Sequence, residues 1–206
     1  MKKLFLTSFF KGVAEAFPNF AGAELGGKTV CFIPTASLPE KVTFYVGADK
    51  KALQKLGLIV EELEITKTPM ERIRECILRA DYLFVSGGNT FFLLQELRRT
   101  EAGKLIAEQI HRGTPYIGAS AGSMILAGNI EYAQHMDSPA AAPDLNGDFE
   151  ALSVTPFSVL PHATNAPFKK AAEKILAAYG DRLDLRPISN NQAIAVEGDE
   201  LKIITV

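Results

Sequence analysis

The sequence predicts a three-layer α/β/α sandwich built on a mainly parallel β-sheet. Short and almost continuous apolar runs, such as Leu4–Phe9, Thr29–Pro34 and Tyr82–Val85, suit strands that are buried on both faces of a parallel sheet. Helical patterns alternate with these runs, as expected when helices cross from one parallel strand to the next. The chain has 206 residues and contains no linker, repeat or low-complexity tract. We therefore expect a single domain over residues 1–206.

In the first half of the chain, glycine and proline set the ends of the expected elements. Pro18 and the Gly26–Gly27 pair shorten the first helix, and Gly57 ends the second. The expected elements are a strand at Leu4–Phe9, a helix within Gly12–Leu25, a strand at Thr29–Pro34, a helix from about Glu40 to Leu56, a strand at Leu58–Ile65, a helix at Met70–Arg79 and a strand at Tyr82–Val85.

The second half continues the alternation and then loosens. Asn129–Glu150 has few apolar residues and contains three breakers, Pro139, Pro143 and Gly147, so it should form a long loop. The expected elements are helices at Phe91–Arg98 and Ala102–Arg112, a strand at Thr114–Ile117, a short strand at Ser158–His162, a helix at Pro167–Tyr179 and edge strands at Leu185–Ile188, Ala193–Val196 and Leu201–Val206.

Composition excludes several classes of function. A net charge of −2 gives no electrostatic footprint for nucleic acid or for an anionic membrane. The apolar N-terminal run imitates a signal peptide, but it is short and is broken by Lys11, so we expect a cytoplasmic protein. Cys31 and Cys76 should be reduced core residues, because two cysteines do not make a disulfide framework. The three histidines are scattered, so no metal site and no cofactor are expected.

The segment Gly118–Gly122 has the pattern of a nucleophile elbow. An apolar run leads into it, Ser120 stands between two Gly-Ala pairs, and a helix-like run follows. Only small neighbours fit around the strained backbone at such an apex. The helix that follows directs N–H groups and the positive end of its dipole at the serine oxygen. Ser120 is therefore the candidate nucleophile.

A serine nucleophile requires a base, a group that orients the base, and donors for the oxyanion. His162 follows a buried strand and should emerge on the same face as Ser120, which makes it the candidate base. His111 fits the dipole at the end of a helix, and His135 in the loop is the weaker alternative. The orienting acid is left open among three loop residues: Asp137, Asp144 and Asp148.

Two backbone N–H groups are candidate oxyanion donors. Ala121 directly follows the nucleophile, and Gly88 lies in the glycine turn after the neighbouring strand. Glycine allows the backbone to approach a substrate closely, because it has no Cβ. The glycine patterns of phosphate-binding and dinucleotide-binding loops are absent.

Three segments together resemble the peptidase E family of aspartyl dipeptidases, serine peptidases related to cyanophycinase. They are Val85–Phe91, Gly118–Gly122 and Pro161–Ala166, in the family's order and spacing. The resemblance implies a fold similar to the class I glutamine amidotransferases, with serine in place of their cysteine. It implies Ser120 as nucleophile, His162 as base, Asp137 as the orienting acid, and Gly88 and Ala121 as oxyanion donors. Within the same segments, the polar residues Asn89, Thr90, Thr164 and Asn165 are expected to contact the substrate.

The chain departs from this family at two places. Some relatives carry a glutamate in a turn near the C-terminus, where this chain has Ile188–Gln192, so that role does not carry over. Aspartyl dipeptidases also have an arginine-bearing insert that is thought to hold the acidic side chain of the substrate. Here Pro167 leads directly into Phe168–Lys170 and the insert is lacking. The resemblance therefore implies the same catalytic groups, but it does not imply the same substrate.

The sequence thus predicts a metal-independent serine hydrolase of short peptides, similar to a dipeptidase and with N-terminal aspartyl peptides among its candidate substrates. An ester or an isopeptide is the alternative substrate within the hydrolases. The alternative outside them is a catalytically silent relative that binds a small ligand in the same pocket. A small peptide is the expected partner, and the oligomeric state is left open.

Overall fold

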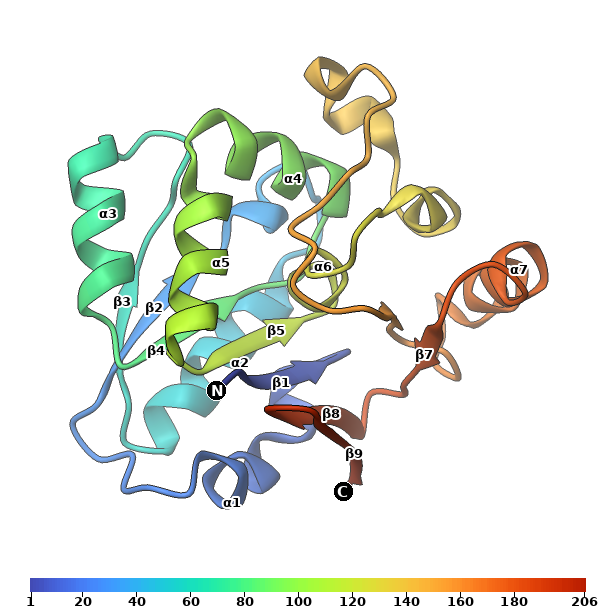
Figure 1. Ribbon diagram of the computed structural model, residues 1–206. Coiled ribbons are helices and arrows are strands. Elements are labelled where there is room, and N and C mark those ends of the chain that lie inside the picture. The colour runs from blue at the N-terminus through green and yellow to red at the C-terminus, as the bar shows by residue number, and fades with distance from the viewer.

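The computed structural model describes all 206 residues and has a seven-stranded central sheet in the order β3-β2-β4-β5-β1-β8-β9 (Figure 1). The first five of these strands are parallel, and β8 and β9 at one edge are antiparallel to their neighbours. The strands are β1 (Lys3–Thr7), β2 (Thr29–Ile33), β3 (Ile59–Glu62), β4 (Tyr82–Val85), β5 (Tyr116–Ala119), β8 (Gln192–Glu197) and β9 (Glu200–Thr205).

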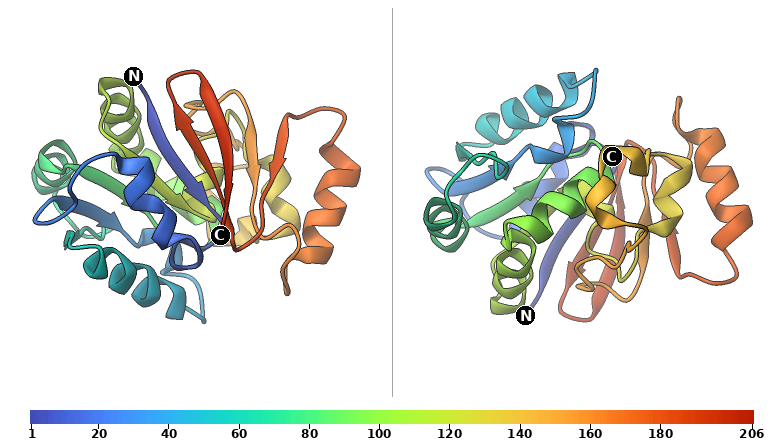
Figure 2. Two further views of the ribbon diagram at one scale, coloured as in Figure 1. Left: turned by 90° about the horizontal axis from the view of Figure 1, so that it is seen from below. Right: turned by 90° about the horizontal axis from the view of Figure 1, so that it is seen from above.

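Helices cover both faces of the sheet, which confirms the predicted α/β fold with a mainly parallel sheet. Figures 1 and 2 show α7 at the opposite end of the molecule from α3. The helices are α1 (Phe17–Ala21), α2 (Phe44–Lys55), α3 (Met70–Arg79), α4 (Thr90–Arg99), α5 (Ala102–Arg112), α6 (Ala121–Met124) and α7 (Lys169–Tyr179). Short 3₁₀ turns lie at Phe10–Gly12, Ala14–Ala16, Thr35–Ser37, Glu131–His135, Pro139–Ala141 and Pro143–Leu145. No helix is both long enough and apolar enough to cross a membrane.

The strands are apolar on both faces because each face supports its own core. Successive side chains of a strand point to opposite faces. In β1, Leu4 and Leu6 belong to a cluster of 39 buried residues beside α3, α4 and α5, whereas Phe5 belongs to a cluster of 18 beside α1 and α2. The smaller cluster is rich in phenylalanine, and Phe32 stacks on Phe84 with ring centroids 4.8 Å apart. This double burial explains the continuous apolar runs in the sequence.

Two predicted helices are shorter in the structure. Within Gly12–Leu25 only Phe17–Ala21 is α-helical, because Gly22 takes a left-handed conformation at φ 64° and ends the helix. The helix expected from about Glu40 begins only at Phe44. The preceding residues form a loop, and the apolar side chains of Val42 in this loop and Phe44 at the start of α2 are 60% and 74% exposed.

The C-terminal strands also differ from the prediction. β6 (Ser158–Leu160) and β7 (Leu185–Pro187) pair with each other in a separate parallel two-stranded sheet and not with the central one. β8 is not an edge strand, because it lies between β1 and β9. The segment Asn129–Glu150 is an irregular loop as expected, and a β-bridge between its first and last residues closes it.

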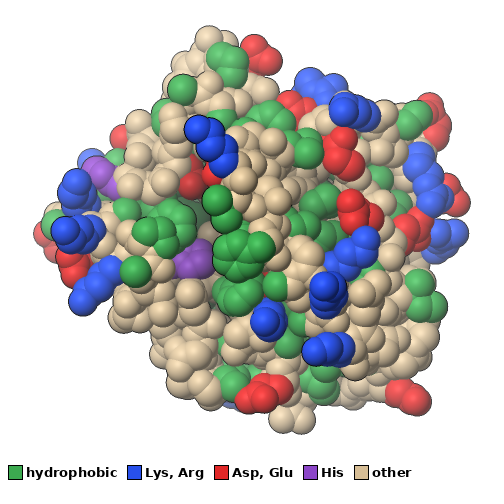
Figure 3. Space-filling view, turned by 180° about the vertical axis from the view of Figure 1, so that it is seen from behind, with side chains coloured by type: hydrophobic (Ala, Val, Ile, Leu, Met, Phe, Trp, Pro, Cys, Tyr) green, Lys and Arg blue, Asp and Glu red, His purple; other side chains and the backbone are tan.

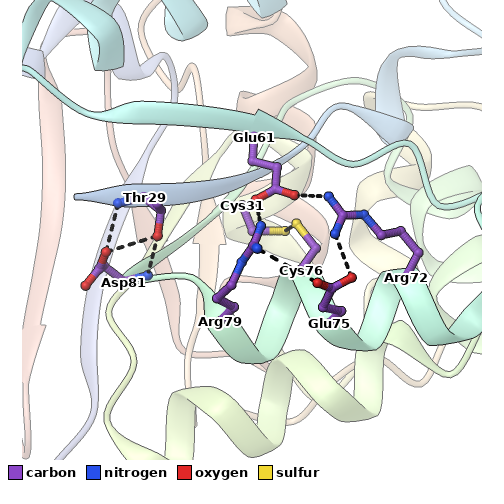
Figure 4. A network of polar contacts seen from close by, with 8 residues as sticks. All are labelled: Thr29, Cys31, Glu61, Arg72, Glu75, Cys76, Arg79 and Asp81. Carbon is purple, nitrogen blue, oxygen red and sulfur yellow. Dashed lines mark hydrogen bonds and ion pairs between the residues drawn. The ribbon is translucent and has the colours of Figure 1, made fainter. Parts of the chain in front are cut away.

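The two cysteines are free and buried, as expected. Cys31 on β2 and Cys76 on α3 lie with their Sγ atoms 3.1 Å apart. The contact with Cys76 and burial both raise the pKa of Cys31, so this thiol stays protonated. Figure 4 shows that Glu61 on β3 binds two arginines of α3 across this contact, with Arg79 Nη2 2.7 Å from Glu61 Oε2. These ion pairs connect α3 to β3, which is the edge strand of the central sheet.

Candidate active site

Ser120 occupies the turn between β5 and α6, at the carboxyl edge of the central sheet. Its backbone has φ 49° and ψ −109°, a conformation that few residues other than glycine adopt. The backbone N–H of Ser120 donates to the carbonyl of Thr7 at 2.9 Å, which anchors the turn to β1. This is the geometry of a nucleophile elbow, as the sequence predicts.

The glycines beside Ser120 are required by close backbone contacts. A Cβ on Gly122 would lie 2.0 Å from the carbonyl oxygen of Val85, and one on Gly118 would lie 2.6 Å from that of Gly122. The elbow therefore packs directly against β4 and the start of its own helix. A larger residue at either position would force the turn away from its neighbours.

A second serine, Ser123, fixes the elbow to β1. Its hydroxyl lies 2.8 Å from the carbonyl of Thr7 and 2.9 Å from that of Gly118, and it accepts the N–H of Thr7 at 3.0 Å. Ser123 is only 1% exposed, so these contacts are made without competition from water. Ser123 therefore stabilises the elbow, a role that its position in the sequence motif does not indicate.

His162 reaches Ser120 from the separate two-stranded sheet. Its Nε2 lies 3.0 Å from Oγ of Ser120, which is within hydrogen-bond distance. The backbone N–H of His162 donates to Oγ of Ser8 at 2.9 Å, and the imidazole stacks on Phe168 with centroids 5.0 Å apart. Burial lowers the pKa of His162 below its usual 6.5, so the ring is neutral at pH 7.

The other imidazole nitrogen contacts Asn190, in the loop between β7 and β8. Nδ1 of His162 lies 2.6 Å from Oδ1 of Asn190. Because an amide oxygen only accepts hydrogen bonds, Nδ1 carries the proton and Nε2 is left to accept from Ser120. Asn165 holds the loop in turn, since its Oδ1 accepts the N–H of Asn190 at 2.8 Å.

The structure does not place Asp137 on the imidazole, contrary to the sequence-based expectation. Its Oδ2 instead accepts two hydrogen bonds from Thr90, from the N–H at 2.8 Å and from Oγ1 at 2.5 Å. Burial raises the pKa of Asp137 to about 6, although the bonds from Thr90 act in the opposite direction. Of the other two candidates, Asp148 pairs with Arg98 at 3.1 Å and the side chain of Asp144 makes no hydrogen bond.

The four residues expected to contact substrate have other contacts. Asn89 caps α4 by accepting the N–H of Phe92 at 3.0 Å, and Thr90 holds Asp137. Asn165 supports Asn190, and Thr164 is exposed with only a distant contact to Asn165 at 3.5 Å. None of the four lines the cavity beside Ser120.

Two N–H groups are free to face an oxyanion. Gly88 makes no hydrogen bond through its N–H. Its φ of 138° and a would-be Cβ only 2.1 Å from the carbonyl of Ala36 restrict the position to glycine. Ala121 is the first residue of α6, so its N–H has no acceptor within the helix. Both N–H groups belong to the residues that the sequence predicts as oxyanion donors, and that role stays a prediction.

A cavity of about 420 Å³ opens beside Ser120 and His162. Figure 3 shows a hollow on this face of the molecule, surrounded by hydrophobic side chains, with a histidine and acidic side chains at it. Its apolar walls come from the segment after β1, the α2 region, α6, the long loop and the segment before α7, namely Phe9, Val42, Phe44, Tyr45, Met124, Met136, Pro167 and Phe168. The cavity is large enough for a dipeptide-sized ligand.

The remaining histidines lie away from this cavity. His111 is in the last turn of α5 before Gly113, as expected for a residue that interacts with the helix dipole, and His135 packs near Tyr179. No group of three or more His, Cys, Asp or Glu side chains is arranged to hold a metal ion.

An elbow serine, a neutral histidine in contact with it and two free N–H donors at the carboxyl edge of a parallel sheet define the class of serine hydrolase-like α/β proteins. Within this class the chain belongs to peptidase family S51, whose profile matches residues 4–204.

Relatives of this family match between four fifths and all of the chain. An uncharacterized peptidase of Listeria innocua is 52% identical over 98% of this chain and 95% of its own length. Peptidase E of Nostoc is 31% identical over 80% of this chain and 67% of its own. The crystal structure of a putative peptidase E protein from Listeria monocytogenes superimposes with a TM-score of 0.95, at 50% identity over 100% of this chain and 99% of the other.

Sequence reasoning missed Asn190. The group that orients a catalytic histidine is usually an acid, and asparagine is not one. The signal was nevertheless present, because Asn190 lies in the C-terminal segment Ile188–Gln192, where some relatives carry a glutamate. The structure places that segment against the imidazole, with the amide in the position that an acid would take.

Proposed function

We propose that this protein is a serine peptidase that cleaves short peptides through an acyl-enzyme intermediate. The observation that carries the proposal is the chain of contacts from Ser120 through His162 to Asn190, at 3.0 Å and 2.6 Å. Membership of family S51 supports a peptide as the substrate. The cavity size supports a short one.

In this mechanism Oγ of Ser120 attacks the peptide carbonyl carbon while Nε2 of His162 takes its proton. The negative charge that develops on the carbonyl oxygen is stabilised by the N–H groups of Gly88 and Ala121. The imidazolium then gives the proton to the leaving amine, and the acyl group stays on Ser120. A water molecule, activated by the same imidazole, releases the acid product.

Asn190 is the orienting group in this proposal. It fixes the tautomer of His162 by accepting from Nδ1, but as a neutral amide it does not stabilise the imidazolium as a carboxylate would. Burial lowers the pKa of His162 although the bond to Asn190 acts in the opposite direction. Ser120–His162–Asn190 is therefore a triad with a neutral third member.

A covalent probe tests the proposal without knowledge of the substrate. A fluorophosphonate phosphonylates an activated serine with loss of fluoride, and intact mass followed by peptide mapping locates the adduct. We expect one adduct at Ser120, none on Ser120→Ala, and labelling roughly 10²-fold slower for His162→Ala, the scale of a lost general base. Ser123 is the internal control and should stay unmodified. No adduct, or an adduct at another serine, would reject the mechanism.

A dipeptide library then tests the substrate class, with release of free amino acids as the readout. We expect hydrolysis by the wild type and none by Ser120→Ala. Hydrolysis of p-nitrophenyl esters with no dipeptide cleaved would instead favour the ester alternative.

A further inference from the structure

The cavity beside Ser120 carries three carboxylates and no cation. Glu40, Asp49 and Asp137 line it, and no lysine or arginine does. His162, the remaining basic group on the lining, is neutral at pH 7 because burial lowers its pKa. The charge that a ligand meets in this cavity is therefore negative.

Asp137 has one carboxylate oxygen without a partner. Both hydrogen bonds from Thr90 reach Oδ2, and no group of the protein donates to Oδ1. The pKa of about 6 leaves the carboxyl mostly ionised at neutral pH. A largely desolvated carboxylate with a bare oxygen on a cavity is an energetically costly arrangement unless a cation or donor binds there.

The position of Asp137 suits the amino group of a bound peptide. Asp137 is held by Thr90, two residues after the oxyanion donor Gly88, and two residues span at most about 7 Å. In an amino acid the α-nitrogen is only about 2.5 Å from the carbonyl carbon, given standard bond lengths and angles. These lengths are compatible with a bound peptide whose first carbonyl lies at Gly88 and whose ammonium group contacts Asp137.

Asp49 adds a second buried carboxylate to the same cavity. It is 1% exposed, and only its Oδ1 is engaged, by the N–H of Lys11 at 2.9 Å. Burial raises its pKa to about 7. The N–H and the charge of Lys11 oppose this rise, so the carboxyl is about half ionised at neutral pH. An acidic side chain entering here would lose its hydration beside these carboxyl groups, and no lysine or arginine lines the cavity to pair with it.

We propose that this cavity is an anionic subsite for the first residue of the peptide. Asp137 pairs with the free α-ammonium group, and Asp49 with Glu40 disfavours an acidic first side chain and accepts a neutral or basic one. The proposal rests on the proposed function, because it assumes that the ligand is a peptide. It assigns to Asp137 the recognition of substrate and not the orientation of the base.

Binding to the inactive Ser120→Ala protein tests this proposal independently of catalysis. Calorimetric titrations would compare Leu-Leu, Lys-Leu, Asp-Leu and N-acetyl-Leu-Leu. We expect Leu-Leu and Lys-Leu to bind at least about tenfold more tightly than Asp-Leu, and acetylation to weaken Leu-Leu by a similar factor or more, corresponding to about 1.4 kcal/mol per tenfold. Equal affinities, tighter binding of Asp-Leu, or no binding of any of the four would overturn it.

Substitutions in the same background assign the effect to residues. Asp137→Asn should remove most of the difference in affinity between Leu-Leu and its acetylated form. Asp49→Asn should reduce the ratio of the affinities for Leu-Leu and Asp-Leu. Asp144→Asn, an acid of the same loop whose side chain makes no hydrogen bond, is the matched control and should change neither ratio. A uniform loss of affinity with unchanged ratios would indicate a merely structural role and would contradict the proposal.

These outcomes are separable from a failure of the catalytic mechanism. Labelling of Ser120 by the fluorophosphonate probe reports on the mechanism alone. If Ser120 is labelled and the affinity order is reversed, the mechanism stands and the subsite assignment fails.

Discussion

The two halves of the candidate site are held in different ways. The Ser120 half is built from backbone, with glycines packed against the carbonyl groups of neighbouring segments. The His162 half is held by hydrogen bonds in which side chains from distant parts of the chain take part. Ser8 and Asn190 bond His162, and Asn165 bonds Asn190. The first half is therefore encoded by a local pattern, whereas the second arises only when distant segments meet.

The two halves also differ in what a substitution should do. In the Ser120 half, two serines have separate roles. Ser120 is the candidate nucleophile, and Ser123 holds the elbow to β1 by hydrogen bonds. In the half built from side chains, one residue, Asn190, both joins the loop to the imidazole and sets its tautomer. Substitutions of these three residues separate the contributions.

Removal of the nucleophile should have the largest effect. Ser120→Ala should lower the rate of peptide hydrolysis by roughly 10³-fold or more, because the covalent route is lost. Far-UV circular dichroism and the melting temperature should match those of the wild type, since no hydrogen bond of the elbow uses Oγ of Ser120 except that with His162. A folded Ser120→Ala protein with wild-type turnover would exclude the mechanism.

Removal of the orienting amide should come next. Asn190→Ala should lower kcat by roughly 10²-fold, less than the ~10⁴-fold known for a charged orienting residue, because the amide fixes the tautomer without adding a charge. Asn191→Ala is the matched control, since its side chain contacts Ser189 and Val206 and not the imidazole. Equal losses in the two variants would show that the loop, and not the amide of Asn190, matters.

Loss of the supporting serine should affect stability first. Ser123→Ala leaves the buried N–H of Thr7 without its partner, so the free energy of unfolding should fall by about 1–3 kcal/mol. Chemical denaturation measures this change. An unchanged free energy of unfolding would mean that the hydroxyl does not hold the elbow to β1.

The contrast between the halves also explains what the sequence could predict. Gly118–Gly122 and Gly88 are recognisable because their small residues are dictated by local backbone geometry. The fold class follows from apolar runs that are buried on both faces. The order of strands at the C-terminal end does not follow, because the pairing of β6 with β7 depends on segments 25 or more residues apart.

The choice between Asp137 and Asn190 illustrates the same limit. An aspartate in the loop before His162 is the chemically natural partner, but the N–H and hydroxyl of Thr90 hold it at the start of α4. Asn190 is brought to the ring by the return of the chain after β7, where Gly12 gives room for the backbone of Asn190. No local sequence pattern indicates the contact between Asn190 and His162.

In the proposed mechanism Asn190, and not Asp137, is the partner of the His162 imidazole. NMR titration of His162 distinguishes the two, with His111 and His135 as internal references. We predict a pKa below 6.5 in the wild type, little change in Asp137→Asn, and a rise of about one unit or more in Asn190→Asp, because a carboxylate favours the imidazolium. Accordingly, the hydrolysis rate of the wild type should fall only as the pH drops through that low pKa, and earlier in Asn190→Asp. A wild-type pKa above 7 that falls in Asp137→Asn and does not respond to Asn190→Asp would contradict the assignment.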